Sequence, residues 1–306
     1  MISISTAWNC TEKNNLRRAL TEIKACGLNS IEIGYNFTVE NLKVLIPLLN
    51  ELRISVASIH NFCPLPEENE FGRFFTNYYL LSSLEERERK KAVFYTKQTI
   101  DTAKRIKAKV VVIHAGAVEM DANYTKELMK LFNDGAIISE KASNIRAAFC
   151  KERRERKKPH IDAVLQSLTD ILEYALCMNI KIGLENRYYA SEIPDSEEAL
   201  FFLEQFSGKG LFYWHDVGHS CIQEYLMLIE KDGLLNKLGK YLIGFHLHDI
   251  HGLKDHLSPL SGDFNFSRIS GYLCDKNILK VIEAHRPSKP EEIQAAINYF
   301  KEKNWF

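Results

Sequence analysis

Acidic residues and histidines occur in five short clusters, each of which follows a run of apolar residues. The residues concerned are His114, Glu185, Asp216 with His219, His246 with Asp249, and Glu283. Carboxylate oxygens and imidazole nitrogens are the usual protein ligands of divalent metal ions. Parallel strands of one sheet bring their carboxyl ends to the same edge. The recurring pattern therefore predicts that these scattered residues form one site.

Eight short apolar runs, rich in β-branched residues, would have to position these clusters. They cover residues 2–6, 30–34, 54–59, 110–114, 180–185, 211–214, 242–246 and 279–283. Segments with helical periodicity follow most of them, at residues 14–26, 39–52, 87–106, 161–178, 196–206 and 291–301. This alternation predicts an α/β protein, a (β/α)₈ TIM barrel, with residues 1–306 forming a single domain.

A doubly wound open sheet is the alternative architecture. Such a sheet normally has a glycine-rich phosphate-binding turn after its first strand. The segment after the first expected strand, Thr6-Ala-Trp-Asn-Cys10, contains no glycine. The sequence therefore favours the closed barrel.

Two segments are longer than one strand–helix unit and are expected to be insertions after strands three and four. The first, residues 61–86, contains Pro64 and Pro66 and is predicted to be a loop over the barrel mouth. The second, residues 117–159, includes the charged run at residues 151–158. Because acids and bases alternate in part of that run, a solvated helical face is favoured over an arm that binds nucleic acid.

The overall composition argues against several classes of partner. Lys and Arg together number 40, and so do Asp and Glu, so the chain has no excess positive charge for DNA or an anionic membrane. The seven cysteines lack CxxC spacing, which argues against a disulfide framework or a thiolate zinc site. The chain opens on an expected strand and has no apolar run of membrane-spanning length, so we expect a cytoplasmic protein.

Four of the clustered residues end four consecutive strands of the expected barrel: Glu185, Asp216, His246 and Glu283. Neighbouring strands lie about 4.8 Å apart, so four inward side chains can reach the same cation. Three carboxylates and one imidazole suit Mn²⁺, Mg²⁺, Co²⁺ or Zn²⁺. Taken singly, each could be a cap or an ion-pair partner, as Asp216 could be for the helix near His219. Four in register favour a metal site.

The order of these motifs resembles that of the xylose-isomerase-like TIM barrels. This superfamily includes sugar isomerases and epimerases, enzymes of inositol catabolism and the endonuclease IV DNA-repair enzymes. The resemblance runs from the third to the eighth strand and leaves the two insertions uncovered. It rests on Ser58-Ile-His60, Val112-Ile-His114-Ala-Gly116, Gly183-Leu-Glu185-Asn-Arg187, His215-Asp216-Val-Gly-His219, His246-Leu-His-Asp249, His256-Leu-Ser-Pro259 and Ile282-Glu283.

The resemblance implies one divalent metal ion on Glu185, Asp216, His246 and Glu283. His246 is chosen over His248 because the family ligand lies three residues before an acid, here Asp249. His248 has the same strand parity and could point inward too. The residues expected to bind substrate are His60, His114, Arg187, His219 and His256.

The residue types suggest a reaction on a sugar, a sugar phosphate or a polyol. A metal that bridges adjacent carbonyl and hydroxyl oxygens would stabilise an enediolate. Glu185 and Glu283 are then the expected catalytic acid and base. Return of the proton to the same carbon gives epimerisation, and return to the next carbon gives isomerisation. The sequence does not choose between them, and a homo-oligomer is compatible with either.

Two other functions stay open. Endonuclease IV binds three metal ions, and His60, His114, His219 and His256 resemble some of its extra ligands, which would add further Zn²⁺. Lys254 stands where that family has a metal-binding Asp, with Asp255 beside it as a substitute carboxylate. With its neutral charge, the chain favours sugar chemistry over nucleic acid. The third reading is a barrel that binds a sugar without turnover.

Four aromatic residues lie near the expected strand ends: Trp8, Tyr35, Phe62 and Trp214. They would either wall a sugar ring or pack the barrel and its loops.

Overall fold

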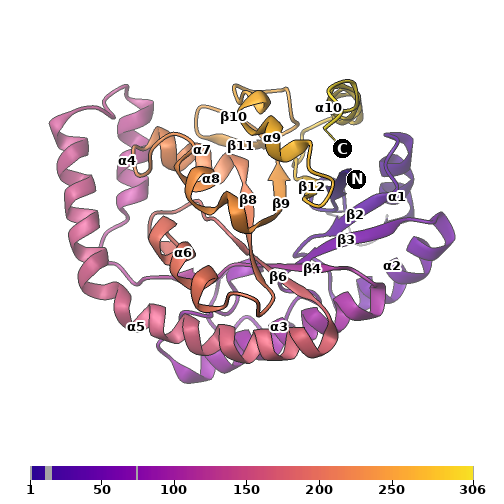
Figure 1. Cartoon of the computed structure of the whole chain (residues 1–306), viewed down its shortest axis with the longest axis horizontal. Coiled ribbons are helices and arrows are strands. Elements are labelled where there is room, and N and C mark those ends of the chain that lie inside the picture. The colour runs from indigo at the N-terminus through magenta and orange to yellow at the C-terminus, as the bar shows by residue number, and fades with distance from the viewer. Residues whose placement is uncertain (1, 11–15, 74, 306) are drawn as a thin grey trace.

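Eight parallel strands close into a barrel in the computed structural model, which describes residues 2–10, 16–73 and 75–305. Their order around the barrel is β1, β2, β3, β4, β6, β8, β9 and β12, and β1 pairs with β12 to close it (Figure 1). This confirms the predicted (β/α)₈ TIM barrel. The strands are β1 (Ile2–Ser5), β2 (Ser30–Ile33), β3 (Ser55–His60), β4 (Val110–Ile113), β6 (Lys181–Glu185), β8 (Leu211–Asp216), β9 (Leu242–Leu247) and β12 (Leu279–Ile282).

Helices surround the barrel and follow most strands, as the periodicity predicts. They are α1 (Leu16–Ala25), α2 (Val39–Leu52), α3 (Glu86–Ile106), α4 (Tyr124–Asn133), α5 (Glu140–Met178), α6 (Ser196–Gln205), α7 (Val217–Tyr225), α8 (Gly233–Leu238), α9 (Ser270–Leu273) and α10 (Pro290–Glu302). The expected start of the first helix, at residues 14 and 15, lies outside the described residues.

The seventh strand is not followed directly by a long helix. A two-stranded hairpin of β10 (Asp249–His251) and β11 (Lys254–Leu257) comes first, and the 3₁₀ turn Phe266–Ile269 leads into the short α9. The hairpin places Asp255 and His256 at the carboxyl end of the barrel strands. These two side chains could bind a metal ion, and they come from the hairpin rather than from a barrel strand.

Local sequence signals fix where several helices begin. The side chain of Asp195 accepts hydrogen bonds from the backbone N–H groups of Glu197 and Glu198, at 2.9 and 2.8 Å. The Glu198 carboxylate in turn accepts from the backbone N–H of Asp195, at 2.9 Å. This capping box satisfies backbone donors that an uncapped helix leaves unpaired. It starts α6 directly behind the loop that follows β6.

The interior of the barrel is filled by side chains beneath the acidic and histidine residues. Val112 lies two residues before His114, Trp214 two before Asp216, and Val281 two before Glu283. Since strand side chains alternate between faces, each apolar residue points inward below its polar neighbour. These apolar residues pack together as one buried cluster. The site therefore lies on a layer of buried apolar side chains.

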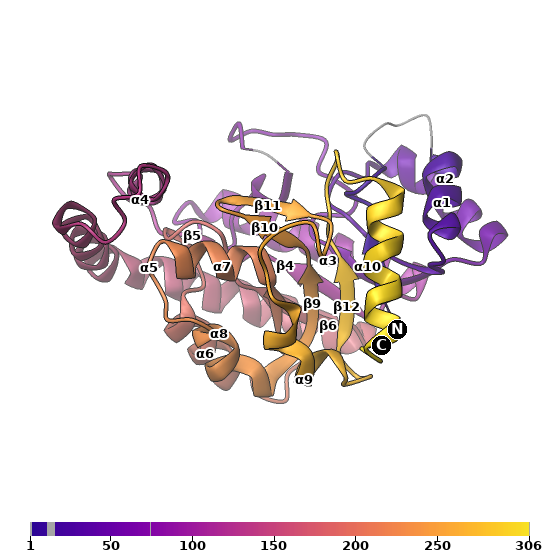
Figure 2. The same cartoon turned by 90° about the horizontal axis from the view of Figure 1, so that it is seen from above.

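The two insertions occur after β3 and β4, as predicted. The described part of the first insertion, residues 61–73 and 75–85, is a loop that contains the short 3₁₀ turn Phe75–Asn77. The second insertion contains β5 (Gly116–Ala117), α4 and the first half of α5. The two helical segments project to one side of the barrel (Figures 1 and 2). β5 pairs in antiparallel fashion with β7 (Glu192–Ile193), which follows β6. The α5 helix has 39 residues, so it starts well before the helix predicted at residue 161.

The charged run at residues 151–158 lies on α5 and is largely exposed or half-buried, as expected for a solvated face. Arg153 is an exception, with 4% of its surface exposed. Its guanidinium donates to the Glu198 carboxylate at 2.7 Å and to the carbonyl oxygens of Ser191 and Glu192 at 2.9 and 3.0 Å. The sequence pattern does not reveal this one position, because its burial depends on contacts with β7 and α6.

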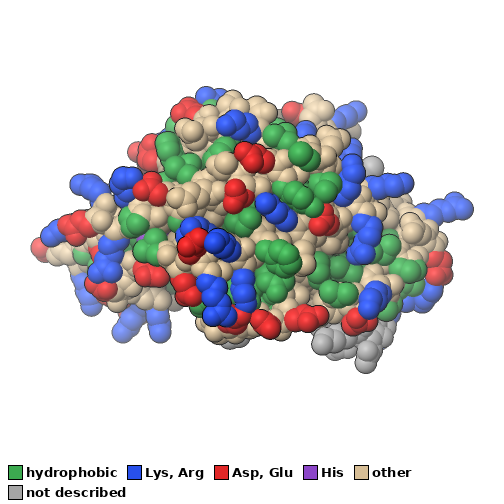
Figure 3. Space-filling view, turned by 90° about the horizontal axis from the view of Figure 1, so that it is seen from below, with side chains coloured by type: hydrophobic (Ala, Val, Ile, Leu, Met, Phe, Trp, Pro, Cys, Tyr) green, Lys and Arg blue, Asp and Glu red, His purple; other side chains and the backbone are tan. Residues whose placement is uncertain are grey.

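The molecular surface carries charges of both signs, in agreement with the balanced composition. In the face shown in Figure 3, Lys and Arg side chains are interspersed with Asp and Glu, and hydrophobic side chains lie between them. Among the described residues, no helix combines the length and the apolar character needed to cross a membrane.

Candidate metal centre

The structure brings together the four side chains predicted to bind a metal ion. Glu185 ends β6, Asp216 ends β8, His246 lies in β9, and Glu283 follows β12 directly. One ligand atom from each residue lies within 4.8 Å of the others, and all four residues are buried. The Nδ1 atom of His246 is 3.1 Å from Glu283, 3.2 Å from Glu185 and 3.7 Å from Asp216.

The chemistry of these donors fits a divalent cation. Three buried carboxylates meet at one point, and such a concentration of negative charge is costly unless a cation balances it. Among the described residues, Arg187 is the one Lys or Arg within ion-pair distance of them, with Nη1 3.7 Å from Glu185. An oxygen-rich set with one imidazole nitrogen is what Mn²⁺, Mg²⁺, Co²⁺ and Zn²⁺ bind. The role of the four as ligands stays a prediction.

Asp216 caps a helix, and its carboxylate also lies among the candidate metal ligands. Its Oδ1 accepts a hydrogen bond from the backbone N–H of His219 at 2.7 Å and so caps α7. Asn186 fixes the end of the strand, because its side chain accepts from Asp216 N at 2.8 Å and donates to Asp216 O at 3.0 Å. Asp216 Oδ2 remains near His246. Capping the helix therefore orients this carboxylate toward the site.

The two glutamates differ in their electrostatic environment. Burial raises the pKa of Glu283 to about 7; the neighbouring charge of His246 lowers it, while the charges of Glu32 and Glu185 raise it. Burial also disfavours the charged form of Glu185, but His114 and His246 lie beside it and hold its pKa well below the ordinary value. Near neutral pH, Glu185 is ionised and Glu283 can hold a proton. Such a divergence separates a base from an acid.

A second group of ligand atoms adjoins the first through Glu185. The Nε2 atoms of His60 and His114 lie 3.2 and 2.8 Å from Glu185 Oε2, and the three residues could hold an ion together. However, Nη1 of Arg187 lies 2.7 Å from the same Nε2 atom of His114. A fixed positive charge thus stands beside this group.

A third group combines the helix cap with the hairpin: His219, Asp255 and His256. The Nδ1 atom of His256 lies 3.0 Å from the carbonyl oxygen of Glu283 and donates to it, because a carbonyl only accepts. This leaves the Nε2 atom of His256 available as a ligand. Asp255, rather than the exposed Lys254, supplies the carboxylate of this group.

Arg187 is held rigidly beside the centre. Its Nε and Nη2 atoms donate to Glu192 Oε1 at 3.2 and 3.1 Å, and the side chain of Gln223 donates to its carbonyl oxygen. The other carboxylate oxygen of Glu192 accepts from the backbone N–H of Tyr189 at 2.8 Å. Since Arg153 binds the carbonyl of Glu192, the chain of contacts extends from α5 to the site.

The structure adds residues that the sequence reasoning did not assign to the site. Glu32 of β2 is fully buried and lies 3.1 Å from Nε2 of His246. In the sequence, the feature that points to Glu32 is its place as the one acidic residue in the apolar run 30–34. His248 also points inward, 3.0 Å from Asp216, as its strand parity allowed. The ring of His285 stacks on His256 with centroids 3.9 Å apart.

Of the four aromatic residues near the strand ends, three are packing residues. Trp8, Phe62 and Trp214 are buried, with at most 1% of their surface exposed. Tyr35 packs edge-on against His60, with ring centroids 5.7 Å apart.

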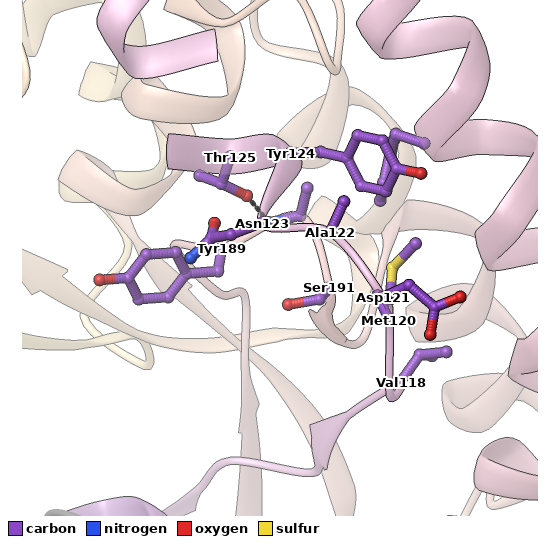
Figure 4. Close-up of a pocket in the computed structure, with 11 residues that line it drawn as sticks. Val118, Met120, Asp121, Ala122, Asn123, Tyr124, Thr125, Tyr189 and Ser191 are labelled. Carbon is purple, nitrogen blue, oxygen red and sulfur yellow. Dashed lines mark hydrogen bonds between the residues drawn. The ribbon is translucent and has the colours of Figure 1, made fainter. Parts of the chain in front are cut away.

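A cavity of about 410 Å³ lies between the segments at residues 118–125 and 189–191, and Phe149 also lines it (Figure 4). The backbone N–H of Ala190 donates to the Thr125 hydroxyl at 2.9 Å and joins the two walls. None of the predicted site residues lines this cavity, although residues 189–191 directly follow the segment that carries Arg187.

Comparison with known proteins supports the same architecture. A D-tagatose 3-epimerase-like protein is 19% identical, with a TM-score of 0.66 over 99% of this chain and 96% of that one. The D-psicose 3-epimerase of Clostridium cellulolyticum H10, solved with D-tagatose, is 14% identical, with a TM-score of 0.68 over 99% of both chains. Likeness at these identities shows the fold.

In sequence, an uncharacterized protein of Methanocaldococcus jannaschii is 27% identical over 195 residues. This match covers 61% of the chain and 54% of the relative, so it spans about half of that protein's length. The model of the xylose isomerase-like TIM barrel family matches residues 20–303. The chain therefore belongs to this family.

Proposed function

We propose that this protein is a divalent-metal-dependent sugar isomerase or epimerase. The observation that carries the proposal is the convergence of Glu185, Asp216, His246 and Glu283, whose ligand atoms meet at the carboxyl ends of four neighbouring strands. The names of the similar structures, which include a D-psicose 3-epimerase and an L-ribulose 3-epimerase, support a sugar as the substrate.

The two glutamates would perform the proton transfers. Glu185 is ionised and would take the proton from the carbon next to the substrate carbonyl. Glu283 would return one from the other side of the bound substrate. They come from β6 and β12, which β8 and β9 separate in the barrel wall, so they face the substrate from different directions. A divalent ion held by the four residues would supply electrostatic stabilisation of the negative charge that develops on two substrate oxygens.

The remaining polar residues would bind and orient the sugar. Arg187 can donate from Nη1, which points toward His114 and Glu185. His219 on α7 and His256 on the hairpin have ring centroids 5.8 Å apart. Together with His60 and His114 they surround the four metal-binding candidates with hydrogen-bonding groups. Such positioning matters because proton transfer requires the reacting atoms to be within hydrogen-bond reach.

Proton exchange from carbon provides the test. Incubation of candidate ketoses and aldoses in D₂O with Mn²⁺-loaded protein should introduce deuterium next to the carbonyl, detected by NMR. Glu185→Gln and Glu283→Gln should each abolish the exchange. A barrel that only binds sugar would give no exchange. Exchange that survives exhaustive chelation would rule out the metal-dependent mechanism.

A second function, metal-dependent cleavage of DNA at abasic sites, is favoured by one observation. Three further groups of ligand atoms lie around the first, so the site could hold additional Zn²⁺. They are His60–His114–Glu185, His219–Asp255–His256 and His248–His256–Glu283. Against this, the guanidinium of Arg187 lies beside His114 and opposes a cation there.

Metal content distinguishes the two functions. Elemental analysis of the purified protein should find about one divalent ion per chain for the sugar enzyme and about three for the nuclease. Nicking of a duplex with an abasic site, lost on chelation, would establish the second function directly.

A further inference from the structure

We propose that Glu32 is a positioning residue for His246: it holds the imidazole in the tautomer and orientation that direct the Nδ1 lone pair toward Glu185, Asp216 and Glu283. The inference rests on the proposed function, because it assumes that those residues bind a divalent ion. No barrel strand next to β9 supplies this contact. Glu32 comes from β2, which β1 and β12 separate from β9.

The contacts on the two sides of the imidazole are different in kind. Nε2 of His246 lies 3.1 and 3.2 Å from the two carboxylate oxygens of Glu32, whereas Nδ1 faces Glu185 and Glu283. Ser58 of β3 donates a hydrogen bond to Glu32 Oε2 at 2.7 Å, which orients the carboxylate. His246 and Glu32 are both fully buried. Water therefore does not compete for this hydrogen bond.

The tautomer follows from the hydrogen-bonding capacity of the two groups. Nε2 faces both oxygens of Glu32, which are hydrogen-bond acceptors, so the tautomer that completes this contact carries its proton on Nε2. Once Nδ1 binds a cation, the single remaining ring proton stays on Nε2. A carboxylate behind a metal-binding histidine also makes the imidazole a stronger donor to the metal. Without Glu32, neither the tautomer nor the ring orientation would be fixed.

Two simpler roles for Glu32 account less well for these contacts. As a direct ligand it would have to approach the ion from the Nδ1 side, but it lies at the opposite nitrogen and outside the group that shares ligand atoms. As a structural ion pair it would need a Lys or Arg, and none within the described part of the chain is at ion-pair distance. A buried carboxylate is costly unless it is hydrogen bonded, and its partners here are His246 and Ser58.

The test is the affinity of the whole protein for Mn²⁺ alone, measured from the EPR signal of free Mn²⁺. Glu32→Met, which removes the acceptor, should weaken binding roughly 10- to 100-fold. Glu32→Gln should weaken it less, because the amide oxygen can still accept from Nε2. This partial rescue distinguishes positioning from general damage to the fold.

Glu88→Gln is the matched control. Glu88 is also a buried carboxylate, but it lies on α3 and pairs with Arg73 and Ser83. Its substitution should lower stability and leave the Mn²⁺ dissociation constant unchanged. A second readout is the ¹⁵N NMR spectrum of the Zn²⁺-loaded protein with labelled histidine. It should show the Nε2–H tautomer for His246 in the wild type.

The outcomes separate this inference from the proposed function. Unchanged Mn²⁺ affinity in folded Glu32→Met would overturn the role of Glu32 alone. If that variant does not fold, unchanged affinity in both Glu32→Gln and Ser58→Ala would do the same, because Ser58→Ala removes the hydrogen bond that orients the carboxylate. Wild-type protein that binds neither Mn²⁺ nor Zn²⁺ would instead overturn the metal-dependent function, and this inference with it.

Discussion

The indole of Trp214 packs against the imidazole of His246, with ring centroids 5.1 Å apart and planes inclined by 67°. Glycines on both neighbouring strands make room for it. A Cβ atom at Gly244 would lie 2.2 Å from the indole, and one at Gly183 would lie 3.1 Å from it. The position of Trp214 in the apolar layer beneath the site therefore depends on glycine at both of these positions.

Gly244→Ala should destabilise the protein, because the indole must move away from the added methyl group within a packed interior. Overpacking of this kind costs about 1–3 kcal/mol of unfolding free energy, measurable by urea denaturation. Gly271→Ala is the control, since no atom lies within 4 Å of its added Cβ. Its effect should stay within about 0.5 kcal/mol. Equal losses in the two variants would contradict the packing argument.

Arg153→Met should destabilise the protein by about 3 kcal/mol, because it leaves the buried Glu198 carboxylate without its closest partner. Lys157, 3.4 Å from the other Glu198 oxygen, partly replaces the lost partner, so the loss should be near the low end of what breaking a buried ion pair costs. Thermal and urea unfolding measure the change. Arg154→Met, at an exposed position of the same helix, should have little effect. A similar cost at both positions would show that Arg153 acts only through helix propensity.

The metal-free protein should lose stability as the pH rises from about 7 to about 9. Burial disfavours protonated His248, but the charge and hydrogen bond of Asp216 raise its pKa to about 9. Its folded pKa exceeds the ordinary 6.5, so its contribution is complete below pH 6.5 and is lost as the pH rises through 9. Below about pH 6.5, Glu283, whose pKa is raised from 4.5 to about 7, acts in the same direction. Four buried histidines oppose it there, because burial lowers their pKa values: His114, His215, His256 and His285.

Urea denaturation in the presence of a chelator, repeated across this range, checks that expectation. His248→Gln should flatten the upper part of the profile, above about pH 6.5. A profile that rises toward pH 9, or that is the same in the variant, would contradict the assigned pKa shifts.

Alkylation of the native protein by iodoacetamide should label three cysteines and spare four. Cys150, Cys177 and Cys274 are exposed, while the others are buried. Burial raises the pKa of Cys63 to about 12, and burial with the nearby Glu22 charge does the same for Cys10. Their reactive thiolate forms are therefore scarce at pH 8. Mass spectrometry before and after denaturation counts the sites, and native labelling of Cys63 would contradict this account.

Much of the barrel could be predicted from the sequence, because strand periodicity and the residues at strand ends are local features. Glu185, Asp216, His246 and Glu283 were predicted as a group, and the structure brings their ligand atoms together. Each of the four residues lies at the carboxyl end of a strand, and the four strands are consecutive in the barrel. These two facts are enough to predict that the side chains lie close together.

Other features depend on contacts between distant segments. Glu32 belongs to β2, and its nearness to His246 follows only from the closure of the barrel through β1 and β12. The burial of Arg153 depends on where α5 crosses β7. The full length of α5 was missed because its first half packs on α4 rather than on the barrel and lacks a regular apolar stripe.

The short pairing of β5 with β7 has a consequence for how the barrel mouth can move. Val118 N donates to Ser191 O at 2.8 Å, and the hydroxyl of Ser82 bonds to the backbone of Ala117 at 2.8 Å in both directions. Three successive loops are thus cross-linked and must shift as one body. Any widening that admits a reactant is therefore expected on the other flank, where the hairpin carrying His256 stands.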